Sequence, residues 1–141
     1  MRRVIFACVH NAGRSQMAAA FFNAMADPGK ARAISAGTAP ADRVHPEVVA
    51  AMHEVEIDLS TARPQRLTPE LARDAALLVT MGCGDECPVV PGMRRLDWSL
   101  VDPKDRSIEV VRSVRDEIAD RVRQLVSAEG WDRSGARAAD G

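Results

Sequence analysis

The feature that most constrains this chain is the stretch at residues 4–15, which reads VIFACVHNAGRS. Its first three residues are apolar and β-branched or aromatic, a run typical of a short buried strand. A helical pattern of apolar residues begins just after the stretch, at residues 17–22. The residues between form a loop at a helix N-terminus, where backbone N–H groups and the helix dipole together favour an anion. The stretch therefore predicts an oxyanion-binding loop.

The side chains of this loop fit the same chemistry. Asn11 and Gly13 tolerate the left-handed backbone conformations that a loop curling around an anion needs. The planar guanidinium of Arg14 can bind two oxygens at once. Cys8 lies in the same positive field, so we expect it to exist largely as the thiolate and to attack the central atom of the anion. The expected oxyanion-binding residues are Val9, His10, Asn11, Ala12, Gly13, Arg14 and Ser15.

Each of these residues also has a plainer interpretation. Cys8 fits a small buried apolar side chain at a strand end, and Arg14 fits a solvated residue of the first helical turn. The hydroxyl of Ser15 can donate to the Cys8 sulfur, but serine near a helix start is also a good cap. Ser35, at the end of a second predicted strand, either supports Asn11 by a hydrogen bond or simply ends its strand.

Composition narrows the class of protein. The chain has 141 residues, of which 46% are hydrophobic and 28% charged, as expected for one globular domain. A net charge of −1 gives no support for a nucleic-acid or membrane partner. No apolar run reaches the length of a membrane span or of a signal peptide, so we expect a cytoplasmic protein. Three cysteines are then expected to stay reduced and to act through their chemistry.

The predicted elements alternate between strand and helix. Strands are expected at residues 4–6, 31–36, 75–81 and 94–98, and helices at 15–26, 46–55, 68–73 and 107–127. This order predicts an α/β fold, a single domain with a four-stranded parallel sheet flanked by helices, that binds its ligand at the carboxyl ends of the strands. We expect the domain to cover residues 1–129 and residues 130–141 to form a flexible tail.

Two further cysteines follow the predicted central strand, at Cys83 and Cys87. In a doubly wound sheet they lie at the same edge as the first loop, which permits a disulfide relay from Cys8 through Cys83 to Cys87. A zinc site is the competing interpretation, but it needs four ligands and the sequence has no second paired cluster. Two inert cysteines remain the third possibility. We expect no metal ion, since His45 and His53 lack the spacing of a metal pair.

Asp102 and Pro103 follow the fourth predicted strand. Proline restrains the preceding residue to an extended conformation, which helps to fix the direction of the Asp102 side chain. An Asp-Pro pair alone is only a turn signal. If its loop folds over the oxyanion site, Asp102 becomes a general acid that protonates the leaving oxygen.

Cys8, Arg14-Ser15 and a distant Asp102-Pro103 together resemble the low-molecular-weight protein tyrosine phosphatase fold and, within it, the thioredoxin-coupled arsenate reductases. The match runs from Val4 to about Leu125 and includes Asn11, residues 14–18, 35–37 and 79–81, Cys83, residues 87–88, Trp98 and residues 102–103. The resemblance implies Cys8 as nucleophile, Arg14 and the loop amides as oxyanion site, Asp102 as acid, and Cys83 with Cys87 as redox pair.

Departures from the pattern weigh against a phosphatase. Phosphatases of this fold usually carry a second cysteine in the anion loop and a tyrosine pair after Asp-Pro. Gly13 and Lys104-Asp105 stand at these positions here, and the chain contains no tyrosine.

Two more departures bear on cofactor and reductant. Some arsenate reductases hold potassium with a glutamate where this chain has Ala19, so we expect no such ion and no cofactor. The short spacing from Cys83 to Cys87 resembles actinobacterial variants, some of whose relatives use mycothiol and a mycoredoxin. We therefore expect reduction of arsenate to arsenite, with phosphate and sulfate as competing oxyanions and thioredoxin or a mycoredoxin-type protein as reductant. The alternatives are a phosphatase and a mycothiol-dependent arsenate transferase.

Overall fold

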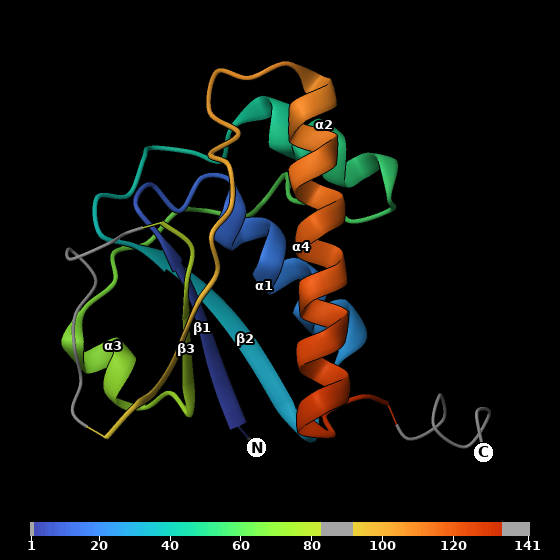
Figure 1. Cartoon of the computed structure of the whole chain (residues 1–141). Coiled ribbons are helices and arrows are strands. Elements are labelled where there is room, and N and C mark those ends of the chain that lie inside the picture. Colours follow the sequence, from blue (N-terminus) through green and yellow to red (C-terminus); the bar gives the residue numbers. More distant parts are fainter. Residues whose placement is uncertain (1, 83–91, 134–141) are drawn as a thin grey trace.

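The computed structural model of the chain describes residues 2–82 and 92–133. Its strands are β1 (Arg2–Cys8), β2 (Ala31–Gly37), β3 (Leu77–Thr80) and β4 (Arg94–Asp97). Its helices are α1 (Arg14–Met25), α2 (Pro46–Glu54), α3 (Pro69–Arg73) and α4 (Ile108–Glu129). The order of strands and helices and the four strands that the sequence predicts are confirmed (Figure 1).

The sheet is parallel throughout, in the order β2-β1-β3-β4. Cys8 at the end of β1 pairs with Gly37 of β2, while Ala7 pairs with Thr80 of β3. Strand β2, the next in the chain, pairs with one edge of β1, and β3 pairs with its other edge. The order therefore reverses beside β1, and the loop after Cys8 opens at the point where doubly wound sheets bind ligands.

Alternate residues of β1 pack on opposite faces of the sheet, as the period of a strand requires. Val4 and Phe6 join the larger core cluster, with α1, α2 and α4, whereas Ile5 and Ala7 join a smaller cluster beside α3. Figure 1 shows α1, α2 and α4 on one side of the sheet and α3 on the other. The fully buried Phe6 ring lies edge-on to Phe22, with centroids 5.9 Å apart. Both faces of β1 are therefore covered, which fixes the strand that carries Cys8.

Local capping signals place several helix ends. The Thr68 hydroxyl accepts a hydrogen bond from the Leu71 N–H, with Pro69 at the first helical position, as predicted. Helix α4 begins after Ser107 and ends at Glu129, followed by Gly130 as C-cap in the left-handed conformation with φ of 73°. The helix therefore runs two residues beyond the end at residue 127 that its apolar stripe predicts.

The tail expected from residue 130 begins with packed residues. The Trp131 ring lies 5.8 Å from the Phe22 ring, and its carbonyl accepts a hydrogen bond from the Asp27 N–H. The Lys30 ammonium donates to the Asp132 carbonyl. Residues 131 and 132 thus cover the end of α1 and extend the ordered chain past α4.

A charged cluster joins α2 to α4. The guanidinium of Arg115, which is buried, donates to the Ala51 carbonyl and to Glu54, and Glu54 also accepts from Arg112. Hydrogen bonds from Arg112 and then Arg115 lower the pKa of Glu54 to about 2. These pairs hold α2 against α4. Helix α2 begins directly after His45, whose N–H donates to the Ala12 carbonyl of the predicted oxyanion loop.

Among the described parts of the chain, no helix combines the length and the apolar character that crossing a membrane requires.

Candidate oxyanion site

The backbone carbonyls of the loop at residues 8–13 all point away from its centre. Four of them accept hydrogen bonds from N–H groups of the connection after β2: Cys8 O from Thr38, Val9 O from Ala39, His10 O from Ala41 and Ala12 O from His45. Gly13 O accepts from Met17 in α1, and Asn11 O accepts from the side chain of Gln16. The connection after β2 therefore serves as the outer wall of the loop.

Outward carbonyls imply inward N–H groups, because the C=O and N–H of one planar peptide unit point in opposite directions. The N–H groups of residues 9–14 are thus directed toward the centre of the loop. At the start of α1, Gly13 occupies the N-cap position and supplies no side-chain cap to the first turn. The loop and the helix start together form the concave array of donors that the sequence predicts for an oxyanion.

A chain of hydrogen bonds reaches the Cys8 sulfur from inside the loop. The Asn11 carboxamide donates to the Ser15 hydroxyl oxygen at 2.7 Å, and this oxygen lies 2.9 Å from the Cys8 Sγ. Because the Ser15 oxygen already accepts from Asn11, its own proton is free to point at the sulfur. All three residues are buried. Such a donor stabilises negative charge on sulfur, which suits a thiolate nucleophile.

Arg14 brings a second segment to the same edge. Its guanidinium lies 3.6 Å from the Asp102 carboxylate and donates to the Leu100 carbonyl at 3.4 Å. It passes over Gly82, where an added Cβ would lie 2.5 Å from Arg14 Nη1. The Arg14 side chain is 8% exposed and that of Asp102 is 47% exposed. The arginine is therefore fixed beside the loop, while the acid remains open to a ligand and to water.

Two glycines allow the close approach of neighbouring segments. A Cβ on Gly37 would lie 2.6 Å from the Val9 carbonyl oxygen, and one on Gly13 would lie 3.1 Å from Pro103 Cγ. Pro103 is buried over Gly13, which places the Asp102-Pro103 turn against the loop. The juxtaposition of the first loop with Asp102, expected from the resemblance, is therefore present in the fold.

Sequence reasoning missed two residues of this site. Gln16 donates to the loop carbonyl of Asn11, and the Gln65 backbone N–H donates to the Asn11 side-chain oxygen at 2.9 Å. Neither carries charge or nucleophilic chemistry. A glutamine at the third position of a helix is a sequence signal for capping. For Gln65, no local sequence pattern predicts a hydrogen bond to a residue more than 50 positions away.

The expectations for Ser35, His10 and the two later cysteines have different outcomes. Ser35 offers its backbone carbonyl to the Gln65 side chain, while the Asn11 carboxamide bonds to Ser15, Gln16 and Gln65. Among the described residues the Asn11 carboxamide thus has partners other than Ser35, and Ser35 lies within β2, two residues before the strand ends at Gly37. His10 lies at the outside of the loop, with Nδ1 3.3 Å from the Ala39 carbonyl oxygen. Cys83 and Cys87 lie outside the described residues, so their predicted relay stays a prediction.

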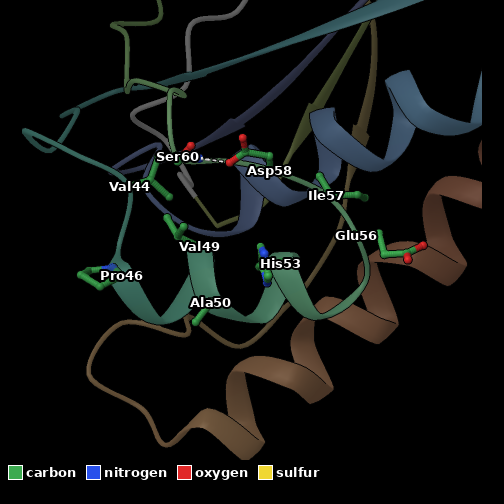
Figure 2. A pocket seen from close by; sticks show the side chains of 9 residues that line it. All are labelled: Val44, Pro46, Val49, Ala50, His53, Glu56, Ile57, Asp58 and Ser60. Atoms are coloured by element: carbon green, nitrogen blue, oxygen red, sulfur yellow. Dashed lines mark hydrogen bonds between the residues drawn. The ribbon is translucent and has the colours of Figure 1, made fainter.

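Away from the loop, the described residues offer a groove but no metal-binding cluster. Within residues 2–82 and 92–133, no cluster of three or more His, Cys, Asp or Glu side chains is arranged to hold a metal ion. A separate open groove of about 1120 Å³ lies beside α2, and Figure 2 shows His53 and Asp58 among the residues around it. None of the predicted site residues that the structure describes lines this groove. Its apolar part comes from Val44, Pro46, Val49, Ala50 and Ile57.

Comparison with known proteins agrees with this geometry. The family model described as low molecular weight phosphotyrosine protein phosphatase matches residues 3–134. A putative arsenate reductase of Halobacterium salinarum is 37% identical over 124 residues, covering 85% of this chain and 87% of that protein. A glutaredoxin arsenate reductase of a Synechocystis species is 35% identical over 130 residues, covering 90% of this chain and 98% of that protein.

A solved structure is similar in both sequence and fold. The thioredoxin-dependent arsenate reductase of Corynebacterium glutamicum superposes with a TM-score of 0.78 at 38% sequence identity. The match covers 91% of this chain and 61% of the Corynebacterium chain, so the present chain spans under two thirds of that protein's length.

Proposed function

The chain belongs to the low molecular weight phosphotyrosine protein phosphatase family, and on that premise we propose that it reduces arsenate to arsenite. The observation that carries the proposal is the Cys8 sulfur, 2.9 Å from the Ser15 hydroxyl at the base of a loop with outward carbonyls. Relatives that cover most of this chain are named arsenate reductases, which selects arsenic among the tetrahedral oxyanions that this loop fits.

The first step uses groups that meet at the loop. The inward N–H groups and the Arg14 guanidinium bind the arsenate oxygens. The Cys8 thiolate attacks arsenic(V) and forms a sulfur–arsenic bond, while an oxygen leaves as water with a proton from Asp102. Asp102 is suited to this role because its carboxylate is open to the ligand and lies 3.6 Å from Arg14, which faces the same anion.

We assign the electron transfer to the three thiols. The Cys83 thiolate attacks the Cys8 sulfur, a Cys8–Cys83 disulfide forms, and the electron pair of the broken sulfur–arsenic bond reduces arsenic to arsenite. Cys87 then attacks Cys83 and frees Cys8. A dithiol protein of the thioredoxin type reduces the Cys83–Cys87 disulfide, and mycothiol with a mycoredoxin is the alternative. This chemistry needs reduced thiols, which fits a cytoplasmic location.

Arsenate-dependent NADPH consumption tests the function. The assay is run in parallel through thioredoxin, through glutaredoxin with glutathione, and through mycothiol with mycoredoxin. We expect turnover by the wild type in the thioredoxin system and none by the Cys8→Ser variant. Absence of turnover in all three systems would overturn the proposal, whereas turnover in another system alone would correct only the reductant.

A phosphatase is the second candidate, because the description of the matching family model names that activity. Hydrolysis of a phosphate ester would use Cys8, Arg14 and Asp102 but neither later cysteine. The Cys83→Ser variant separates the two functions. We expect it to lose arsenate turnover while keeping any weak hydrolysis of an aryl phosphate. Full arsenate turnover by this variant with thioredoxin as sole reductant would rule out the relay.

A further inference from the structure

We propose that Gln16 is a positioning residue of the oxyanion site, a role that deepens and rests on the proposed function. Among the described residues, five of the six loop carbonyls at residues 8–13 accept from backbone N–H groups, and only the Asn11 carbonyl accepts from a side chain. Gln16 Nε2 lies 3.1 Å from this oxygen. The ring of outward carbonyls is therefore completed by a group that a single substitution can remove.

The Gln16 carboxamide donates to carbonyl oxygens on two segments of the chain. Its Nε2 group donates to the Asn11 carbonyl, to the Asn11 side-chain oxygen at 3.3 Å and to the Arg63 carbonyl at 3.2 Å. The residue is 6% exposed. In the usual capping box, a glutamine at this third helical position accepts from the N-cap N–H. Here it instead donates to carbonyl oxygens, so its role is directed at the loop rather than at the helix.

Asn11 is the residue that most needs this support. It is fully buried and holds a left-handed backbone conformation, with φ of 51°. The Gln65 N–H fixes its side-chain oxygen from the other side, at 2.9 Å. Gln16 and Gln65 thus hold Asn11 in the position from which its Nδ2 donates to Ser15, and Ser15 in turn contacts Cys8.

Removing the Gln16 donor leaves the buried Asn11 carbonyl without a partner among the described residues, a state that costs more than the bond itself contributes. Rotation of the peptide between Asn11 and Ala12 then becomes favourable, because it lets the Asn11 carbonyl find another hydrogen-bond donor. Rotation turns the Ala12 N–H out of the anion cradle and brings a carbonyl oxygen toward the bound oxyanion. The site loses one donor to a charged ligand and acquires a repulsive contact.

The test uses inorganic phosphate as the probe and isothermal titration calorimetry as the measurement. Gln16→Met keeps the length of the side chain and removes both its donors. We expect its Kd for phosphate to rise by about tenfold or more, the effect of losing a hydrogen bond to a charged group. Asn23→Leu is the matched control. The Asn23 carboxamide also comes from α1 and exchanges two hydrogen bonds with the backbone of Ala33 in β2, away from the loop.

The control separates positioning from general stability. Both variants should lower the thermal unfolding temperature, but only Gln16→Met should weaken phosphate binding. Gln16→Glu provides a second variant of nearly the same shape, with its carboxylate facing three carbonyl oxygens, and should bind phosphate at least as weakly as Gln16→Met. Wild-type phosphate affinity in Gln16→Met or Gln16→Glu, or equal weakening in Asn23→Leu, would overturn the role of Gln16.

The titration is independent of arsenate chemistry. If the wild type binds phosphate but does not turn over arsenate, the proposed function fails while the role of Gln16 is still measured. If arsenate turnover is present and the Gln16 variants bind phosphate like the wild type, only the positioning role fails.

Discussion

Replacing Gly37 by alanine should displace the oxyanion loop, because the new methyl group has no room. An added Cβ would lie 2.6 Å from the Val9 carbonyl oxygen, 2.9 Å from Asn11 Cβ and 3.0 Å from Asn11 N. Gly37 is unable to retreat, since its N–H donates to the Gln65 carbonyl and its carbonyl accepts from the Leu67 N–H. The strain therefore falls on the loop.

The distances give the size of the effect. Moving the Val9 oxygen from 2.6 Å to an ordinary contact at 3.4 Å requires a shift of about 0.8 Å. The hydrogen bond from Ala39 to Val9, 2.8 Å long, opposes such a shift. Overpacking of this kind costs about 1–3 kcal/mol of unfolding free energy. In a chain of this size, that lowers Tm by about 3–4 °C for each kcal/mol.

Phosphate titration calorimetry and thermal unfolding together test this prediction. Gly37→Ala should lose both stability and phosphate affinity, because the displaced residues carry the inward N–H groups. Gly29→Ala is the control: its Cβ would meet only the Asp27 side chain at 3.4 Å, an ordinary contact, and should change stability by about 0.5 kcal/mol or less. A Gly37→Ala protein with wild-type Tm and wild-type phosphate affinity would refute the packing argument.

Three further perturbations follow from the structure. Arg14→Lys should weaken phosphate binding by about tenfold in the same titration, because an ammonium has no planar fork for two oxygens. Hydrogen bonds from Arg112 and Arg115 lower the pKa of Glu54 from 4.5 to about 2, so the ionised form is favoured in the folded state. The stability advantage of the wild type over Glu54→Gln should be full above pH 4.5 and vanish as the pH falls toward 2, as read by urea unfolding at each pH. Trp131→Ala should cost about 2 kcal/mol in thermal unfolding without changing phosphate affinity, since this ring packs far from the loop.

Local patterns account for what the sequence predicted correctly. The strand predicted at residues 4–6 lies within β1, which runs from Arg2 to Cys8, and Thr68 and Pro69 begin a helix as predicted. Both were predictable because strand propensity and capping depend on neighbouring residues. The strand at residues 75–81, predicted as central, contains β3, which lies between β1 and β4 in the sheet.

Contacts between distant segments account for what it missed. The wall of N–H donors at residues 38–45 has no side-chain signature, because backbone groups make the bonds. Gln16 is a neutral residue whose role depends on where the loop carbonyl of Asn11 points. The loss of periodicity at Gly130 predicts that Trp131 belongs to a tail, yet its ring packs on Phe22 in α1. Such contacts follow from the assembled fold rather than from spacing.

The central claim is that Cys8 thiolate chemistry in this loop reduces arsenate, and a single turnover tests it most directly. Fully reduced protein is mixed with arsenate without any external reductant, and arsenite and free thiols are both counted. Because reduction of arsenic(V) to arsenic(III) takes two electrons, we expect two thiols to be lost for each arsenite formed, with Cys8 free again in peptide maps. The Cys8→Ser variant should form no arsenite. Arsenite formation by Cys8→Ser, or no arsenite and no thiol loss in the wild type, would contradict the account.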